Sequence, residues 1–181
     1  MDRRIIVIVG ASGSGKTTIA NLLQEGGIPR LITTTTRPIR EGEVDGVDYH
    51  FATDEEVATK AFVEMTSYAG YTYGLTIQAV QDGYEKSDTV SVIVDKNGAK
   101  AIKRLYPDEV IIVYLSVGEE TIIERMTVRG DSEEAIFDRV EHARRTGEFE
   151  FKDADIILQD LSPEDNAEWL KALTVGELAY V

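Results

Sequence analysis

Residues 10–17 read Gly-Ala-Ser-Gly-Ser-Gly-Lys-Thr and come directly after the apolar run Ile5–Val9. The helix-like stretch Thr17–Gln24 follows, so a strand, a glycine-rich turn and a helix succeed one another. Glycines at both ends of the turn allow the backbone to form a cradle whose N–H groups point at phosphate oxygens. A glycine-rich surface turn is the alternative, but the whole stretch matches the phosphate-binding pattern in the required strand-to-helix context. The sequence therefore predicts a phosphate-binding loop and a bound nucleoside triphosphate.

Two side chains of this loop have distinct tasks in binding a triphosphate. Lys16 is expected to reach the β- and γ-phosphates, and Thr17 is expected to offer its hydroxyl to Mg²⁺. We therefore expect the chain to bind the triphosphate together with Mg²⁺. The residues expected to bind the triphosphate, and ATP in particular, are Gly10, Ala11, Ser12, Gly13, Ser14, Gly15, Lys16, Thr17 and Thr18.

Composition favours one well-packed domain. The chain has 181 residues, 43% of them hydrophobic, which is enough for a single core with a small insertion. It contains no cysteine, which excludes disulfides and thiolate metal sites, and its two histidines, His50 and His142, are too far apart in sequence to suggest a metal site. The N-terminal apolar run is too short for a signal peptide, and no later run approaches bilayer-spanning length. We expect a cytoplasmic protein.

Net charge limits the kind of substrate. The 19 Lys and Arg residues against 33 Asp and Glu residues give a formal net charge of −14, which repels nucleic acids over the whole surface. A polynucleotide substrate is therefore not expected. A small anionic substrate has to be held by local arginine clusters that act at short range. Two clusters stand out, one around Arg37 and Arg40 and one from Arg125 to Arg145.

Buried-strand patterns alternate with helix-like stretches along most of the chain, which predicts an α/β fold with a parallel sheet flanked by helices. Residues 31–83 differ, because they are rich in Thr and interrupted by Gly and Tyr, and we expect a small strand-rich insertion there. Ser132 is expected to cap a helix that runs to about Arg145. The expected strands are Ile5–Val9, Val90–Val94, Val110–Leu115 and Ile156–Leu158, and the other expected helices are Thr17–Gln24, Asn97–Leu105, Glu119–Met126 and Pro163–Leu173.

A second long pattern occupies residues 34–51, which read Thr-Thr-Thr-Arg-Pro-Ile-Arg-Glu-Gly-Glu-Val-Asp-Gly-Val-Asp-Tyr-His-Phe. Here the chain resembles the guanylate kinase family, in which a phosphate-binding loop is followed by a Thr-Thr-Arg-x-x-Arg-x-Gly-Glu stretch and an Asp-Gly-x-Asp-Tyr-x-Phe stretch. All three are present in order. The resemblance covers about Ile5 to Leu158. It continues through Phe62-Val63-Glu64, Tyr73-Gly74, Val94-Asp95, Arg125, Arg129-Gly130 and Arg139.

The resemblance implies an enzyme that transfers the γ-phosphoryl group of ATP to GMP and releases ADP and GDP. The expected partners are these nucleotides, with no nucleic acid and no membrane, and the expected state is a monomer or a homodimer. It also implies a single guanylate-kinase-like domain over residues 1–181, with core segments at residues 1–30, 84–124 and 146–181, an acceptor-binding insertion at residues 31–83 and a helical lid at residues 125–145.

Two arginines three residues apart can fork onto one phosphate, because each guanidinium offers paired charge-assisted hydrogen bonds to a dianion. Arg37 and Arg40 have this spacing, so we expect them to hold the phosphate of GMP. By resemblance, Tyr49 and Tyr73 donate phenolic hydroxyls to the same phosphate. Both tyrosines could instead be half-buried strand residues with a polar tip.

Glu64 stands in the apolar stretch Phe62–Met65, where a charge is costly unless it is paired or lines a pocket. By resemblance it accepts hydrogen bonds from guanine N1–H and the exocyclic amine, a donor pair that adenine lacks. Thr33 matches the small hydroxyl residue that touches the base in the family, and Asp95 matches the acidic residue that organises magnesium or GMP. The alternatives are an exposed strand residue for Glu64 and a turn residue for Asp95.

Arg125 and Arg129 are four residues apart and share a helix face, and Arg139 lies on the next helical segment. By resemblance, all three belong to a mobile lid. In phosphoryl transfer, charge spreads over the equatorial oxygens of the moving group, and arginines brought in by closure stabilise that charge while water is excluded. Together with Lys16, these arginines are the expected catalytic residues.

Leu75 departs from the family, which usually has serine or threonine after Tyr-Gly at this position. One polar contact to the acceptor is then missing, which leaves open another nucleoside monophosphate as the acceptor. A second alternative is a non-catalytic guanylate-kinase-like binding module that uses the fold for protein ligands. A pure binder has no physical need for a complete triphosphate cradle or for lid arginines, and this chain retains both.

Overall fold

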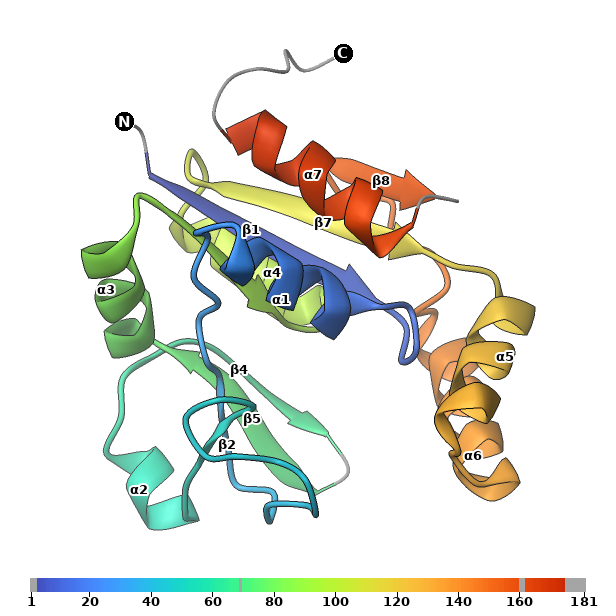
Figure 1. Cartoon of the computed structure of the whole chain (residues 1–181). Helices are drawn as coiled ribbons and strands as arrows, with labels where there is room; N and C mark the ends of the chain where they lie inside the picture. The colour runs from blue at the N-terminus through green and yellow to red at the C-terminus, as the bar shows by residue number, and fades with distance from the viewer. Residues whose placement is uncertain (1–2, 69, 160–161, 175–181) are drawn as a thin grey trace.

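A parallel β-sheet forms the centre of the molecule (Figure 1). The computed structural model describes residues 3–68, 70–159 and 162–174. Four strands are hydrogen-bonded in the order β6–β1–β7–β8, and every pair is parallel. The expected α/β fold with a parallel sheet is therefore confirmed. The strands are β1 (Arg4–Gly10), β6 (Thr89–Ile93), β7 (Val110–Ser116) and β8 (Ile156–Gln159).

Helices cover both faces of this sheet, and the alternation of side chains along β1 explains why. Ile5, Val7 and Val9 pack in the core on the α4 side, whereas Ile6 and Ile8 pack with α1 and α7 on the opposite side. Each of these side chains is at most 2% exposed. Burying one such side chain contributes about 1.5–3 kcal/mol, so a strand that is apolar on both faces favours a helix layer on each side. The covering helices are α1 (Lys16–Glu25), α4 (Lys96–Leu105) and α7 (Pro163–Thr174).

A short extended segment at residues 30–31 adds to the edge of the sheet beside β6. The Leu31 N–H donates to the carbonyl of Ser91 (2.7 Å), and the Ser91 N–H donates to the carbonyl of Pro29 (2.8 Å). Residues 31–36, the Thr-rich start of the expected strand-rich insertion, are divided between the two sheets. Leu31 packs in the central core, and β2 of the second sheet is confined to Thr34–Thr35, because the chain passes from one sheet to the other between them.

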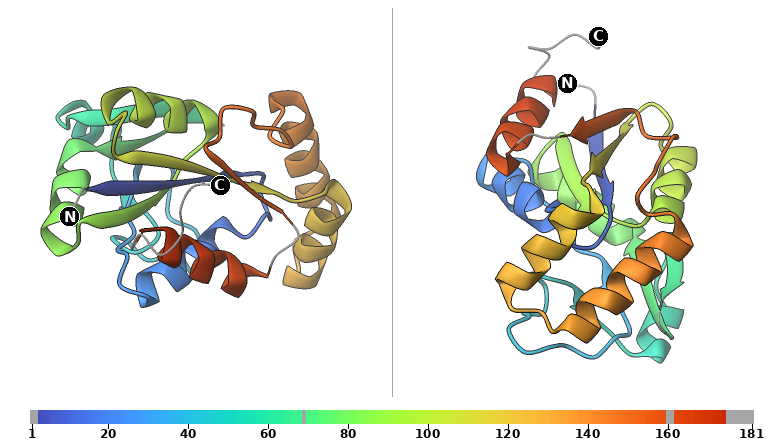
Figure 2. Two further views of the ribbon diagram at one scale, coloured as in Figure 1. Left: turned by 90° about the horizontal axis from the view of Figure 1, so that it is seen from above. Right: turned by 90° about the vertical axis from the view of Figure 1, so that its right-hand side faces the viewer.

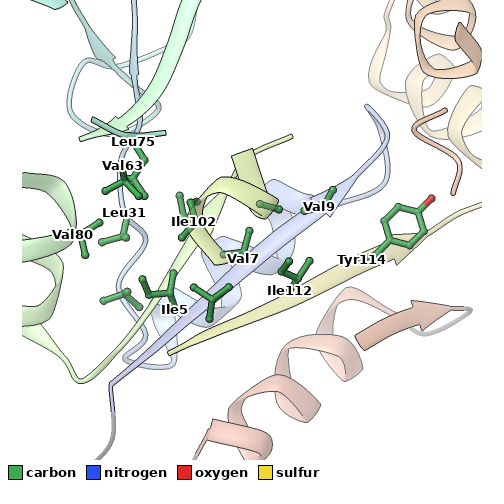
Figure 3. Close-up of a cluster of buried hydrophobic side chains, with 14 of the residues drawn as sticks. Ile5, Val7, Val9, Leu31, Val63, Leu75, Val80, Ile102, Ile112 and Tyr114 are labelled. Carbon is green, nitrogen blue, oxygen red and sulfur yellow. The ribbon is translucent and has the colours of Figure 1, made fainter. Parts of the chain in front are cut away.

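The middle of the chain forms a second sheet in the order β3–β2–β5–β4, which lies below the central sheet in Figure 1. Its base joins the central core, because Val63 and Leu75 pack beside Leu31 and Val80 (Figure 3). The strand-rich character is as expected, but two helices escape the sequence pattern, and the second of them crosses the expected boundary at residue 83. The elements are β2 (Thr34–Thr35), β3 (His50–Phe51), α2 (Asp54–Ala58), β4 (Phe62–Tyr68), β5 (Tyr71–Thr76) and α3 (Ile77–Lys86).

Two further helices follow β7 and form a hairpin, which Figure 2 shows in its right-hand view. Met126 of the first helix packs against Val140 of the second and against Ala11 of the phosphate-binding loop. The expected N-cap is confirmed, because the Ser132 hydroxyl accepts a hydrogen bond from the Ala135 N–H (3.2 Å). The first helix begins ahead of residue 125, where the expected lid starts. The hairpin consists of α5 (Glu119–Arg129) and α6 (Glu133–Thr146).

Two expectations concern the chain as a whole. None of the described helices is long and apolar enough to cross a membrane. The expected core segments include residues 1–2, 160–161 and 175–181, which lie outside the described residues.

Candidate active site

The phosphate-binding loop connects β1 to α1 and has a backbone geometry that requires its glycines. Gly13 and Gly15 have φ angles of 83° and 98°, in the left-handed region that favours glycine. A Cβ on Gly10 would lie 2.7 Å from the Ser14 hydroxyl oxygen, so the loop closes too tightly for a side chain there. Helix α1 begins at Lys16 without a side-chain cap, which leaves the N–H groups of its first turn available to an anion.

Lys16 folds back over this loop. Its ammonium donates to the carbonyls of Gly10 (2.7 Å) and Ala11 (2.9 Å). Burial lowers the pKa of Lys16 to about 8, although the negative charge of Glu148 acts in the opposite direction. The charged form is therefore held less firmly than in water, and an anionic oxygen beside the ammonium would stabilise it.

A cavity of about 630 Å³ opens beside Lys16. The start of α1 contributes to its wall, the middle of the chain contributes a second part, and the α5–α6 hairpin contributes a third. Its volume is in the range of small-molecule binding sites. Seven of the residues expected from the sequence line it, namely Lys16, Thr17, Thr33, Arg40, Tyr49, Arg129 and Arg139.

The hairpin places two of the three expected arginines against the phosphate-binding loop. Arg125 donates to the Ser14 carbonyl (3.2 Å), and Arg139 donates to the Ser12 hydroxyl (3.3 Å). Arg129 instead hydrogen-bonds Asp131 through Nε (3.0 Å), and Arg139 lies 3.6 Å from the same carboxylate. Asp131 therefore ties the two helices of the hairpin together at the cavity, a role that the sequence pattern does not reveal.

A smaller cavity of about 290 Å³ lies on the other side of the loop. Ser14 and Arg125 form part of its wall, together with residues 115–118 at the end of β7 and just beyond it, and residues 162, 163 and 166 around the start of α7. The Ser14 hydroxyl oxygen is buried without a hydrogen-bond partner among the described residues. Sequence reasoning misses this cavity, because the segments that complete it, around residues 115–118 and 162–166, lie far apart in the chain and carry no recognisable motif.

Arg37 is expected on the acceptor side of the site, where it is buried with 6% of its surface exposed; it does not itself line the cavity, whereas Glu43 does. Its Nη1 and Nη2 donate to the two carboxylate oxygens of Glu43, at 3.0 and 2.7 Å. The hydrogen bond to Glu43 raises the pKa of Arg37, and Tyr73 acts in the same direction. Glu43 is part of the motif at residues 34–51, yet its spacing alone does not indicate that it pairs with Arg37. Arg40 is exposed at the cavity.

The two expected tyrosines stand together beside Arg37. The rings of Tyr49 and Tyr73 meet edge to face with centroids 5.9 Å apart, and the Arg37 guanidinium lies 5.5 Å from the Tyr49 ring. Burial raises the pKa of Tyr49, so its hydroxyl stays neutral and able to donate. Both tyrosines are half-buried, and they flank a guanidinium rather than simply filling a strand surface.

Glu64 is buried at 7% exposure, which excludes the alternative of an exposed strand residue. Its Oε1 accepts from the Leu75 N–H (3.0 Å). Burial, and to a lesser extent the charge of Asp95, raises the pKa of Glu64 to about 7. Asp95 caps α4, since its Oδ1 accepts from the Gly98 N–H (2.7 Å). The two carboxylates thus meet at the start of α4, next to the cavity residues but not among those that line it.

Close packing around Glu64 also explains a glycine. A Cβ on Gly98 would lie 2.9 Å from Glu64 Oε2, so the helix backbone approaches the carboxylate directly. Leu75 is fully buried in the central core, and its backbone rather than its side chain contacts Glu64. The departure at Leu75 therefore adds apolar packing beneath the acceptor side while the carboxylate keeps a backbone donor.

Comparison with known proteins agrees with this geometry. The family model described as guanylate kinase matches residues 2–175. A guanylate kinase of Thermus thermophilus is 34% identical, over 96% of this chain and 82% of that protein, and one of Chlorobium luteolum is 33% identical, over 87% and 84%. The crystal structure of a guanylate kinase from Anaplasma phagocytophilum has the same fold, with a TM-score of 0.68 at 20% identity over 99% of this chain and 88% of that one. The chain belongs to the guanylate kinase family.

Proposed function

We propose that the protein is an ATP-dependent guanylate kinase that phosphorylates GMP. The observation that carries this proposal is the cavity of about 630 Å³, which has Lys16 and Thr17 on one side and Arg40 and Tyr49 on the other. A donor triphosphate and an acceptor monophosphate can therefore meet in one cavity. The retained lysine and hairpin arginines favour catalysis over a pure binding module.

On the donor side, the backbone of the loop and the first turn of α1 would hold the phosphates of ATP, with Lys16 on the β- and γ-phosphates. The cavity of about 290 Å³ beyond Ser14 and Arg125 would take the adenosine. Thr17 is exposed at the larger cavity, and one hydroxyl together with phosphate oxygens and water is a donor set that suits Mg²⁺. When bound there, Mg²⁺ would neutralise charge on the phosphates.

On the acceptor side, Arg37, Arg40, Tyr49 and Tyr73 would hold the phosphate of GMP. Glu64 would accept from the guanine N1–H and exocyclic amine, with Thr33 and Asp95 beside the base. Adenine offers no such pair of donors, so it would leave the buried carboxylate unpaired at a cost of about 1–3 kcal/mol.

The chemistry requires positioning more than covalent catalysis. An oxygen of the GMP phosphate attacks the γ-phosphorus of ATP in line, the bond from that phosphorus to the bridging oxygen breaks, and ADP leaves as GDP forms. Lys16, Arg125, Arg129 and Arg139 would stabilise the negative charge on the transferring group. Because Arg125 and Arg139 already contact the loop, a small movement of the hairpin suffices to bring them to the phosphates and to exclude water.

We also propose that the protein acts on nucleotides in the cytoplasm, which is consistent with a chain that lacks cysteine. Its net charge of −14 does not suit a polynucleotide substrate.

The test is ADP formation by the purified protein with ATP and Mg²⁺, offered GMP, dGMP, AMP, CMP and UMP separately beside a sample without acceptor. We expect turnover with GMP and dGMP alone. Turnover with another monophosphate would indicate that Leu75 and its neighbours, rather than Glu64, determine which base is accepted. An inactive protein that still binds GMP would favour the binding-module alternative.

A further inference from the structure

Arg37 has two edges on which it can bind an oxyanion, and the structure uses one of them. A guanidinium carries five N–H donors, arranged as an end edge formed by Nη1 and Nη2 and a side edge formed by Nε and Nη2. Glu43 takes the end edge with both oxygens, and the second Nη1 hydrogen reaches the Pro38 carbonyl (2.7 Å). Tyr73 also hydrogen-bonds the Arg37 side chain, and none of the hydrogen bonds from Arg37 to Glu43 and Pro38 uses Nε of the side edge.

The surroundings restrict how Arg37 can turn. Its guanidinium lies 5.5 Å from the Tyr49 ring and 5.6 Å from the Phe51 ring, and 6% of the residue is exposed. A cation at this depth is costly without a paired anion. Glu43 therefore both neutralises the guanidinium and fixes its rotation between the two rings.

Glu43 is itself held in place by the segment that carries Arg40. Its Oε2 accepts from the Arg40 backbone N–H (2.8 Å), and its own N–H donates to the Arg40 carbonyl (3.1 Å). The second bond closes a turn over residues 40–43 in which Gly42 has a φ angle of 84°. One carboxylate thus connects the buried arginine to the backbone of the exposed arginine.

We propose that Glu43 is a positioning residue for the acceptor phosphate, which holds Arg37 by its end edge so that the side edge faces the phosphate and sets its register with Arg40. This inference rests on the proposed function, because it assigns Arg37 and Arg40 to the phosphate of GMP. It concerns the phosphate rather than the base, since Glu43 touches neither Glu64 nor Asp95.

Replacing Glu43 by glutamine tests this role with the least change in shape. The amide keeps one acceptor oxygen, but its NH₂ group would face an N–H of Arg37, so one charge-assisted bond is lost and Arg37 is free to rotate. We expect the Kd for GMP to rise about tenfold or more and the Kd for guanosine, which has no phosphate, to change by less than about twofold. Glu55→Gln is the matched control, because it removes the same charge from the exposed face of α2, outside both cavities, and should alter neither Kd.

The binding constants of GMP and guanosine should be measured for the wild type and both variants, with thermal unfolding as a check on the fold. Equal losses for GMP and guanosine in Glu43→Gln would overturn the inference, because they indicate general disruption. Unchanged or tighter GMP binding would also overturn it, and would mean that Glu43 competes with the phosphate for Arg37.

A second variant protects the test against a failure to fold. Glu43→Asp keeps the charge but withdraws the carboxylate by one methylene, so it cannot reach Arg37 and the Arg40 N–H together, and we expect the same selective loss of GMP. Retention of wild-type GMP binding by this variant would contradict a positioning role. A wild-type protein that binds no GMP would instead refute the proposed function, which the same measurement reveals separately.

Discussion

The phosphate-binding loop and the acceptor side of the cavity are both built to hold phosphate, but they do so with different parts of the chain. The loop spans residues 10–15 between one strand and one helix, and its geometry depends on backbone conformation at Gly13 and Gly15. The acceptor side uses side chains from segments as far apart in the chain as Thr33 and Asp95. A local anion site can be recognised in sequence, whereas a site made of side chains depends on how distant segments pack.

The two sides also differ in how they balance charge. Near the loop, Lys16 binds backbone carbonyls and has a lowered pKa of about 8. On the acceptor side, Arg37 is neutralised by Glu43, and Glu64 is buried with a pKa raised to about 7. The donor side therefore lacks a strong counter-charge for its cation, whereas the acceptor side already contains one. Substitutions on the two sides should have distinguishable effects.

The largest effect is expected on the donor side. Lys16→Met should lower kcat by about 10³-fold or more, because the ammonium is the cation closest to the expected γ-phosphate. The fold should survive, since the substitution removes a buried charge whose protein partners are two loop carbonyls. Steady-state rates at saturating ATP and GMP measure kcat, and a thermal unfolding curve measures whether the fold survives. Substantial turnover by a folded Lys16→Met protein would remove this residue from the reaction.

The hairpin should contribute less than Lys16 does. Arg139→Ala removes a guanidinium that reaches the Ser12 hydroxyl, and we expect kcat to fall about 10²-fold with little change in the KM of either substrate, because the cation acts mainly in the transition state. Arg145→Ala is the control on the same helix, since Arg145 binds the carbonyl of Glu141 within α6. Equal rates for the two variants would show that Arg139 has no catalytic part.

A substitution at Glu64 should weaken the binding of GMP and leave the binding of ATP unchanged. Glu64→Gln should raise the KM for GMP by roughly 10–100-fold and leave the KM for ATP within about twofold, because an amide cannot accept from two guanine donors. With a pKa of about 7, the wild-type carboxylate is mostly ionised at pH 8 and mostly protonated at pH 6, so GMP affinity should weaken as the pH falls. The ratio of GMP affinities of wild type and variant, measured at pH 6 and pH 8, isolates this effect. Equal losses for GMP and ATP would remove Glu64 from base recognition.

Glu64→Gln should weaken GMP binding, but it should raise the stability of the folded protein above neutral pH. Burial raises the folded pKa of Glu64 above its unfolded value, so stability is fully present below the unfolded pKa and is lost as the pH rises through about 7. Glutamine carries no charge at any of these pH values. Glu64→Gln should therefore match the wild type near pH 5 and be about 1–3 kcal/mol more stable at pH 8, in denaturant unfolding. A variant that is less stable at both pH values would mean that the carboxylate is held by more than the Leu75 N–H.

The smallest effect is expected at the contact between α4, which begins on the acceptor side, and α6, which carries Arg139. Lys96, at the start of α4, donates to the carbonyls of Thr146 (3.1 Å) and Gly147 (2.7 Å) at the end of α6. Lys96→Met should cost about 0.5–1 kcal/mol of stability and lower kcat a few-fold, because α6 carries Arg139. Lys100→Met is the control on the same helix, where the ion pair to Asp153 is exposed. Identical kinetics for both variants would show that this connection does not influence the hairpin.

The sequence predicts those parts of the fold that depend on local patterns, and it misses those that depend on contacts between distant segments. The apolar runs that became β1, β6 and β7 are buried on both faces, so their pattern alone identifies a parallel sheet, whereas the edge strand β8 leaves Ile157 exposed. The Ser132 cap and the loop glycines are equally local signals. By contrast, α3 is missed although the Thr76 hydroxyl caps its start, because it follows β5 directly, and the segment at residues 31–36 is divided because tertiary packing separates its two ends.

The site shows the same limit. Spacing identifies Arg37, Arg40 and Lys16, because each lies within a contiguous motif. It does not identify Glu43 as the partner of Arg37, Asp131 as the link between Arg129 and Arg139, or the smaller cavity beside Ser14. Each of these depends on side-chain geometry or on segments brought together by the fold, for which the sequence carries no periodic or positional pattern.

A crystal structure with GMP bound tests the central claim most directly. We predict that the guanine N1–H and exocyclic amine donate to Glu64, and that the phosphate lies on the side edge of Arg37 with Arg40, Tyr49 and Tyr73, while Glu43 keeps the end edge. GMP bound with its phosphate on the loop at residues 10–15, or with its base away from Glu64, would contradict the division of the cavity into a donor side and an acceptor side.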